Sequence, residues 1–500
     1  MYIIITMFQL FPGIKREHCA CPVWESIMAD KFRSEKDSLG AFQVPAEAWY
    51  GIQTARAVDN FPISGRRPDR DFILAHVRIK RAAAVVNEAA GALEPRLARA
   101  VIEAADAIIA GRYLDEFVVD RFQAGAGTSH NMNTNEVLAN LANVALGGKR
   151  GEYRPVHPND HVNMGQSTND TIPTAIRLAA LVKLPGLLNA IDSLANELET
   201  IARREVNTVK SGRTHLQDAV PTTIGREFGA YAWTLRRGAE QIHQVKPLLC
   251  EIGLGGTAAG TGLNSVPGYA AHVAEELARI TGEPLRTSDN LTAQMQSMHD
   301  LQRLSGAIRD LALELTRLAN DMRLLASGPR TGLGEIELPA VQPGSSIMPG
   351  KVNPVMFEML NQVCYQALGQ DHAMALMSQA GQLELNVMMP GMGSALFDAM
   401  DWLTNAVNAV AEKGVRGIKV HRDRCRELAQ TSVGIATLLN TSIGYRAAAE
   451  VARESERTGR PVREIVAEKG LMSAAEFDRL VERAAIDGNI VIPRHEKSEN

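Results

Sequence analysis

Residues 291–325 read LTAQMQSMHDLQRLSGAIRDLALELTRLANDMRLL, and no other run indicates the fold class as clearly. Apolar side chains recur there at every third or fourth position, which places them in one stripe along a helix face. A continuous helix of this length would reach about 50 Å, at ~1.5 Å per residue. Helices this long pack in extended bundles, often across subunits. The stretch therefore predicts a helical-bundle protein.

Helical patterns dominate the rest of the chain, and strand-like alternation is scarce. Hydrophobic residues make up 45% of the chain and aromatic residues only 5%, so Leu, Ala, Val, Ile and Met must fill the core. This composition is typical of a mainly α, soluble protein. The further helices are expected over residues 71–110, 133–146, 174–206 (kinked at Pro185-Gly186), 222–246 and 354–380.

The chain is predicted to form three domains: an N-terminal domain over 28–166, a central long-helix domain over 167–423 and a small C-terminal domain over 424–500. Residues 1–27 are expected to be a non-native or disordered extension, with Met28 as the preferred start. The apolar residues 1–11 are too short to span a bilayer, and the basic residues follow them, the reverse of a signal peptide. No other stretch is expected to cross a membrane.

Charge and cysteine content narrow the class of protein further. The formal net charge is −4, so no basic surplus indicates nucleic-acid binding. The five cysteines are scattered and odd in number, which argues against a disulfide framework and for a reducing cytoplasm. His18, Cys19 and Cys21 form one short cluster without a distant partner, so no metal site is expected there.

Four polar clusters interrupt the apolar pattern. Three precede predicted helix starts, at Ser167–Asn169, Arg213–His215 and Ser345–Asn353, and the fourth surrounds Thr128. Helix N-termini carry free N–H groups and a positive dipole end, so several that converge would form a cage for carboxylates. Ser, Thr and Asn are also common helix caps, and a single cluster is explained as well by capping.

The cluster from Gly344 to Pro354 reads as a mobile loop that feeds a helix. Asn353 suits the N-cap and Pro354 the first helical position. Lys351 adds a full charge beside that helix start, which favours an anion and eases ionisation of a nearby serine. Elsewhere, His215 is the natural acid/base candidate. Glu358, one turn into the helix, would orient its imidazole if the fold brings the two together.

Two other motifs are weaker. Gly253–Gly260 resembles a phosphate loop, but no Gly-Lys-Ser/Thr follows it and no strand is expected before it. His157 and His161 are four residues apart, but Pro158 disfavours a helical pair, so no zinc site is expected.

The loop Gly344–Pro354 resembles the signature loop of the fumarase/aspartase superfamily. Residues 125–133, 166–170 and 212–218 match further motifs of that family, and the resemblance covers roughly residues 35–485. It implies a mainly α, three-domain subunit that forms a homotetramer around a shared helical core, with each active site built from three subunits. The implied reaction is a reversible anti elimination that gives fumarate from a small dicarboxylate, without a cofactor.

The resemblance also implies individual roles. Ser345 would be the base, because its six-residue spacing to the lysine fits the family better than that of Ser346. Lys351 would help to ionise it, and Lys351 and Asn353 would bind the carboxylate that becomes a dianion. His215, paired with Glu358, would assist substrate binding. The other substrate-binding residues implied are Thr128, Ser167, Thr168, Asn169, Thr214 and Arg56.

The choice of substrate is a finer question. Ser167–Asn169 and residues 381–388 resemble aspartases, which implies release of ammonia from L-aspartate. Residues 154–160 resemble the stretch that forms a second dicarboxylate site in fumarases. Met389 stands where aspartases usually carry an acid, and Asn440-Thr441 replaces their Asn-Pro. Fumarate hydration, elimination from another N-substituted aspartate, and a catalytically silent structural protein remain open, because fold does not fix function.

Overall fold

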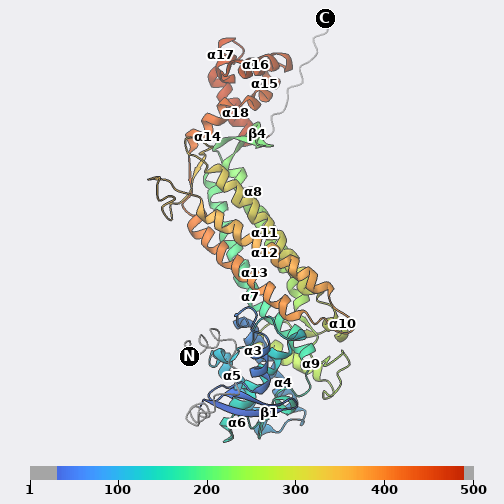
Figure 1. Ribbon diagram of the computed structural model, residues 1–500. Coiled ribbons are helices and arrows are strands. Elements are labelled where there is room, and N and C mark those ends of the chain that lie inside the picture. The colour runs from blue at the N-terminus through green and yellow to red at the C-terminus, as the bar shows by residue number, and fades with distance from the viewer. Residues whose placement is uncertain (1–30, 489–500) are drawn as a thin grey trace. The chain divides into compact units, whose positions relative to one another are not determined.

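The computed structural model describes residues 31–488, which are mainly α-helical, and the predicted fold class is confirmed (Figure 1). The predicted extension over 1–27, Met28 and the cysteines at 19 and 21 lie outside the described residues. The chain divides into two compact units, each built from several segments. Of the described residues, unit 1 comprises 31–182, Pro247–Leu301 and Met374–Ser394, and unit 2 comprises Lys183–Lys246, Gln302–Ala373 and 395–488. The three predicted domain boundaries remain predictions.

Unit 1 is built on the helices α3 to α6 and α9. Helix α4 packs against α5 and α9, and α6 packs against α5 and α3. Val77, Val101, Ile108, Phe117 and Leu138 are fully buried in its core. Its elements are β1 Phe32–Asp37, β2 Gly40–Pro45, α3 Ile52–Asn60, α4 Arg70–Ala89, α5 Pro95–Ile109, η2 Leu114–Glu116, η3 Gly125–Gly127, α6 Thr128–Ala145, η4 Pro158–Val162, β5 Glu251–Ile252, α9 Tyr269–Thr281, β6 Arg286–Thr287 and α10 Leu291–Gln296.

Long helices make up most of unit 2. Five of the described helices have residues in both units: α7 Thr168–Arg204, α8 Ile224–Leu249, α11 His299–Leu325, α12 Val355–Gln379 and α13 Met389–Val410. Within unit 2, side-chain pairs at 2.6–2.9 Å join them: Arg236–Glu199 (α8–α7), Lys183–Asp401 (α7–α13), Tyr231–Asp321 (α8–α11) and Ser305–Asp371 (α11–α12).

The C-terminal helices of unit 2 have a hydrophobic cluster of their own, which includes Ile435, Leu439, Val451, Ile465 and Phe477. In Figure 1 these helices gather beside β4, and α18 contacts β3 and β4. The remaining elements are β3 Val209–Thr214, β4 Gln217–Thr223, β7 Ile336–Glu337, η5 Ala411–Val415, β8 Lys419–Val420, α14 Arg422–Thr431, η6 Val433–Ile435, α15 Ala436–Ile443, α16 Tyr445–Thr458, α17 Val462–Glu468 and α18 Ala474–Asp487.

The predicted helix over 291–325 is two helices, α10 and α11. Ser297 adopts an extended backbone conformation between them, at φ −112° and ψ 130°. Its hydroxyl oxygen accepts the N–H of His299, so Ser297 caps a new helix, a local signal that the apolar periodicity hides. The stripe itself is confirmed, because Met295, Met298 and Leu301 are fully buried. Helix α7, by contrast, continues through Pro185-Gly186 as one helix.

Helix α7 is also long and apolar enough to cross a membrane, by length and composition alone, which the sequence analysis did not expect. More than half of its most apolar window is buried inside the protein. It carries Arg177, whose side chain is 1% exposed and lies 2.6 Å from the carboxylate of Asp300. A buried ion pair and buried apolar side chains are what a core helix of a globular protein requires.

The three cysteines in the described part of the chain are buried: Cys250, Cys364 and Cys425. Burial raises the pKa of the Cys364 and Cys425 thiols to about 12. These thiols therefore remain protonated and act as small apolar groups.

Candidate active site

Thr128 is the first residue of α6, five residues earlier than the sequence pattern indicated. Gly127 before it has φ 88°, and a Cβ there would lie 3.0 Å from Ile172 Cγ1, so only glycine fits this turn. The Thr128 side chain is exposed, and its hydroxyl donates weakly to Gly125 O at 3.4 Å. The tight turn therefore leaves this hydroxyl accessible at a helix N-terminus.

Ser167, Thr168 and Asn169 are partly exposed at the start of α7. The Ser167 hydroxyl oxygen accepts the N–H of Asn169 at 3.2 Å, and the Asn169 amide donates to Ala258 O at 2.9 Å. Thr168 Oγ1 accepts from Asn131 Nδ2 at 3.0 Å. Each of the three predicted substrate-binding side chains is thus oriented by a hydrogen bond to another group of the protein.

The buried carboxylate of Asp170 ties this helix start to the glycine loop Gly253–Gly260. It accepts the N–H groups of Ser167, Gly255 and Thr257 at 2.9–3.0 Å. Burial raises its pKa to about 6, and these donors oppose the rise. The loop therefore binds a carboxylate of the protein itself. A short strand, β5, does precede it, contrary to the sequence analysis.

Sequence reasoning missed Lys80, which is fully buried on α4. Its ammonium donates to the amide oxygens of Asn131 at 2.7 Å and Asn163 at 2.8 Å, and burial lowers its pKa to about 7. Lys80 lies three residues after Val77 and four before Ala84 on an apolar helix face. A lone charge in such a stripe was the available signal.

Two buried histidines lie in the same unit. The His130 ring stacks on Phe72, with centroids 4.5 Å apart, and burial lowers its pKa to about 3. Its two ring nitrogens make no hydrogen bond within residues 31–488. His76 Nδ1 lies 3.0 Å from Thr134 Oγ1, and burial also lowers its pKa well below the usual value. Both rings are therefore neutral at physiological pH.

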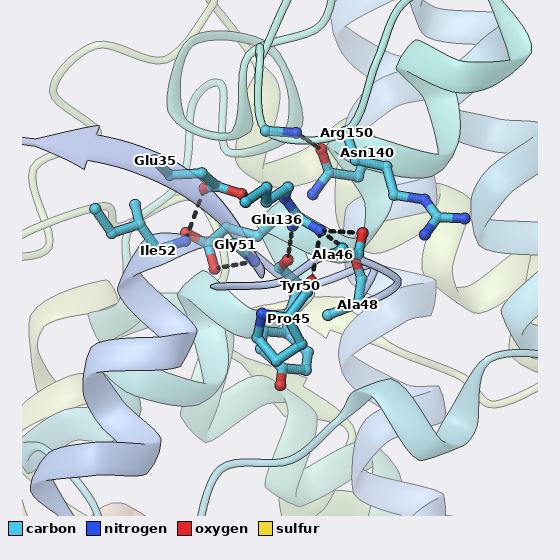
Figure 2. A network of polar contacts seen from close by, with 12 residues as sticks. Glu35, Pro45, Ala46, Ala48, Tyr50, Gly51, Ile52, Glu136, Asn140 and Arg150 are labelled. Atoms are coloured by element: carbon cyan, nitrogen blue, oxygen red, sulfur yellow. Dashed lines mark hydrogen bonds and ion pairs between the residues drawn. The ribbon is translucent and has the colours of Figure 1, made fainter. Parts of the chain in front are cut away.

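A buried glutamate on α6 holds the segment that begins α3. Figure 2 shows Glu136 facing this segment, and its carboxylate accepts the N–H groups of Gly51, Gln53 and Thr54 at 2.9–3.1 Å. Glu35 accepts the N–H of Ile52 at 2.9 Å. The positive end of α3 is therefore already neutralised by two protein carboxylates.

Gly51 directly precedes α3, and Arg56 lies within it. A Cβ on Gly51 would lie 1.8 Å from Tyr153 Oη, so the approach to the network requires glycine. The Arg56 guanidinium lies 2.8 Å from Asp37 and holds the pKa of that carboxyl below its usual value. The role of Arg56 in carboxylate recognition remains a prediction, and in this structure the group is engaged with Asp37.

In unit 2, Thr214 and His215 lie at the tip of the β3–β4 hairpin. The helix expected over 222–246 is confirmed as α8, which begins at Ile224. The polar cluster Arg213–His215 does not lead directly into it, because β4, which contains Pro221, lies between them. His215 and Leu216 have φ 56° and 58°, which makes a two-residue turn of the type that hairpins favour. Both are non-glycine residues at positive φ, so the exposed tip stores backbone strain.

The base of this hairpin is fixed by a buried carboxylate. Glu335 is fully buried and accepts bonds from Arg213 at 3.0 Å and Lys210 at 3.1 Å. Lys210 also lies 2.8 Å from Glu227 on α8. These ion pairs fix the strands of the hairpin, and the exposed His215 lies on the short, strained turn that joins them.

The signature loop Gly344–Pro354 makes few bonds. Ser345 Oγ accepts the N–H groups of Ile347 at 3.2 Å and Met348 at 3.1 Å. Two donors aimed at one hydroxyl oxygen favour its anionic form, as a proton-abstracting serine needs. Ser346, its competitor for the role of base, is exposed.

Lys351, Asn353 and Glu358 complete this region. Asn353 Nδ2 donates to Gly344 O at 2.8 Å and so closes the loop, in place of the predicted helix cap. Across residues 31–488, the Lys351 ammonium makes no hydrogen bond or ion pair, and no bond joins His215 to Glu358. The pairing of those two side chains remains a prediction.

The two remaining motifs lie in unit 1, and a second dicarboxylate site over residues 154–160 remains a prediction. His157 Nδ1 accepts the N–H groups of Asn159 and Asp160, and His161 Nδ1 accepts the N–H of His157. Met389 is fully buried at the start of α13.

The arrangement in unit 1 offers hydroxyl and amide donors at helix starts, and unit 2 offers a serine, a lysine and a histidine. Two family models match the chain: one described as a lyase over residues 40–369, and one described as the fumarase C C-terminus over residues 435–485.

Curated relatives are similar over almost the whole chain. An aspartate ammonia-lyase from Pseudomonas fluorescens is 45% identical, over 93% of this chain and 97% of its own. A class II fumarate hydratase from Ralstonia nicotianae is also 45% identical, over 90% and 98%. The crystal structure of a fumarate lyase:delta crystallin from Brucella melitensis superposes with a TM-score of 0.87 at 44% identity, covering 90% and 98%. The motifs, the fold and these relatives agree that the chain belongs to the fumarase/aspartase superfamily.

Proposed function

We propose that the protein is an aspartate ammonia-lyase, a carbon–nitrogen lyase that converts L-aspartate reversibly to fumarate and ammonia. The observation that carries this proposal is the 45% identity to an aspartate ammonia-lyase along almost the full length of both chains. The polar groups at Thr128, Thr168, Ser345 and Lys351 fit the reaction, because each is a donor or base suited to a dicarboxylate.

In the proposed mechanism, Ser345 removes a proton from Cβ of the substrate. The electron pair of that C–H bond moves into the adjacent carboxylate, which becomes an enediolate-like dianion. Lys351 and Asn353 stabilise the added charge. The pair then returns to form the C=C bond as the C–N bond breaks and ammonia leaves. One lost donor to such an anion typically costs ~10²–10³ in rate, so the charge-stabilising groups supply much of the catalysis.

The remaining predicted contacts are assigned by the family resemblance. Thr128, Ser167, Thr168, Asn169 and Thr214 hold the second carboxylate and the amino group, and Arg56 contributes to carboxylate recognition. His215 assists substrate binding beside Glu358. No cofactor is required, since these side chains supply the base and the donors.

We also infer that the active enzyme is a homotetramer in the cytoplasm, with each site drawn from three subunits. Large apolar side chains are exposed on three of the long helices: Trp233 (65%), Leu313 (49%) and Tyr365 (54%). Apolar groups exposed along bundle helices are typical of faces that other subunits cover. Sedimentation of the purified protein as a monomer at micromolar concentration would contradict this inference.

The substrate is tested by giving purified protein L-aspartate and, separately, L-malate, and following the ultraviolet absorbance of fumarate. We expect turnover with aspartate and little with malate. Turnover with malate alone would favour fumarate hydration, the alternative that the Ralstonia relative supports. Turnover with neither would point to another N-substituted aspartate or to a silent structural protein.

A further inference from the structure

Lys80 is a buried charge that the proposed mechanism does not use. It is 0% exposed, and its ammonium donates to two neutral amides, Asn131 and Asn163, at 2.7 and 2.8 Å. The carboxylate of Asp170 provides a favourable electrostatic interaction. A charge removed from water costs stability unless its environment compensates. A fully buried lysine on an apolar helix face therefore calls for a functional explanation.

The bonds of Lys80 fix which way the Asn131 amide faces. Lys80 Nζ donates to the amide oxygen of Asn131, so this oxygen points toward the lysine. A second constraint comes from Asn163, whose Nδ2 donates to Gln166 O at 3.2 Å. Asn163 therefore presents its oxygen to Asn131, and Asn131 Nδ2 lies 3.3 Å from it. Lys80 holds both amide oxygens, and the two contacts together direct the Asn131 Nδ2 group away from Lys80.

That Nδ2 group meets the Thr168 hydroxyl. Asn131 is 3% exposed, and its Nδ2 lies 3.0 Å from Thr168 Oγ1. An amide nitrogen only donates, so the hydroxyl oxygen must accept here, and its hydrogen must point elsewhere. Among residues 31–488, no group accepts that hydrogen. Thr168 is partly exposed, so its hydrogen is available to a ligand.

We propose that Lys80 is a positioning residue which, through Asn131, presents the Thr168 hydroxyl as a hydrogen-bond donor to a substrate carboxylate. A carboxylate only accepts hydrogen bonds, whereas the substrate ammonium only donates them. A hydroxyl whose hydrogen is directed outward is therefore matched to the carboxylate. The inference rests on the proposed function and on Thr168 contacting substrate, and it names the group that Thr168 recognises.

The test compares three variants with the wild type: Lys80→Met, Thr168→Val and the double variant. Methionine matches the lysine side chain as far as Cε but lacks the nitrogen. The Asn131 and Asn163 oxygens then lose their shared donor, so the Asn131 amide can rotate toward the Thr168 hydrogen. Lys183→Met is the matched control. Lys183, on α7, is also nearly buried. It pairs with Asp401 and has no assigned role in substrate binding.

Two quantities are measured for each protein: the KM for aspartate, and the dissociation constant of succinate, a dicarboxylate without an amino group. We expect Lys80→Met and Thr168→Val each to weaken both by about 10-fold, the size of a lost hydrogen bond to a charged group. The double variant should resemble Thr168→Val alone, because both changes remove the same contact. Lys183→Met should leave both quantities within about twofold of the wild type.

Asn131→Asp provides a second test of the proposal if Lys80→Met does not fold. The new carboxylate still accepts from Lys80, but its second oxygen accepts the Thr168 hydrogen and reverses the hydroxyl. We again expect weaker succinate binding, by about 10-fold or more. The proposal would be overturned by unchanged succinate binding in the folded variants, or by an effect of Lys80→Met that persists in full beside Thr168→Val.

Turnover of the wild type is measured first. A wild type that is inactive with aspartate would count against the proposed function. An active wild type whose Lys80→Met variant binds aspartate and succinate normally would count against the positioning role alone.

Discussion

The surroundings of Thr168 in unit 1 and the signature loop in unit 2 hold their functional groups differently. Thr168 is backed by Asn131, Asn163 and Lys80, all bonded to one another at 2.7–3.3 Å. Ser345 receives two backbone N–H bonds from its own loop. The contrast indicates that unit 1 supplies a preorganised binding surface, whereas the reactive serine lies on a segment that relies on local contacts. Substitutions should therefore affect binding and stability in the first region, and turnover in the second.

Ser345→Ala should give the largest effect and the clearest test of this contrast. Loss of the base should lower kcat by ~10²–10⁴-fold. The melting temperature should remain near that of the wild type, because among the described residues the Ser345 side chain bonds only within its own loop. Ser346→Ala is the matched control and should remain active. If Ser346→Ala is the inactive protein and Ser345→Ala is not, the base has been assigned to the wrong serine.

Glu136→Gln tests unit 1, where we expect substitutions to lower the stability of the fold. The amide nitrogen of glutamine would face backbone N–H donors, so the capping of α3 would be lost. We expect the free energy of unfolding to fall by about 3 kcal/mol, because buried N–H donors lose their charged acceptor. Thermal melts of this variant and of Glu152→Gln, whose side chain is 55% exposed, provide the measurement. Equal melting temperatures for the two variants would contradict a structural role for Glu136.

His130→Phe should give a smaller effect that depends on pH. The folded pKa of His130 is about 3, below the ~6.5 of an unfolded histidine. The unfolded chain therefore binds more protons between these values, and the wild type loses stability as pH falls through that window. Phenylalanine cannot be protonated, so between pH 7.5 and pH 5 the variant should lose about 1–2 kcal/mol less stability than the wild type.

Melts at pH 5 and pH 7.5 measure this difference, with the exposed His243 replaced by phenylalanine as the control. A wild type and a His130→Phe variant that lose the same stability between the two pH values would show that burial of His130 does not govern acid sensitivity.

Sequence periodicity predicted the fold class because the apolar stripes are long and regular, as the buried positions of α11 confirm. It could not predict the break at Ser297, where one capping hydroxyl outweighs a continuous stripe. It also missed the β3–β4 hairpin, because the turn at His215 and Leu216 lacks the Gly or Asn that usually marks such turns.

The candidate site was predicted in part. Short polar motifs identified Thr128, Thr168, Ser345 and Lys351 because exposed polar loops stand out from apolar helices. The buried charged residues of unit 1 did not stand out in the same way. Glu136 and Lys80 lie within helical patterns, and their partners are 51 to 85 residues distant along the chain. Only the folded chain shows which amide or N–H group each of them contacts.

The buried cysteines have a practical consequence for chemical labelling. Burial raises the pKa of the Cys364 and Cys425 thiols to about 12. Maleimide reagents need the thiolate, so they should react very slowly with these two thiols under native conditions. A fluorophore attached to a cysteine in place of Ile347, whose side chain is 83% exposed, would then report on the signature loop with little background, once Cys19 and Cys21 are replaced by serine.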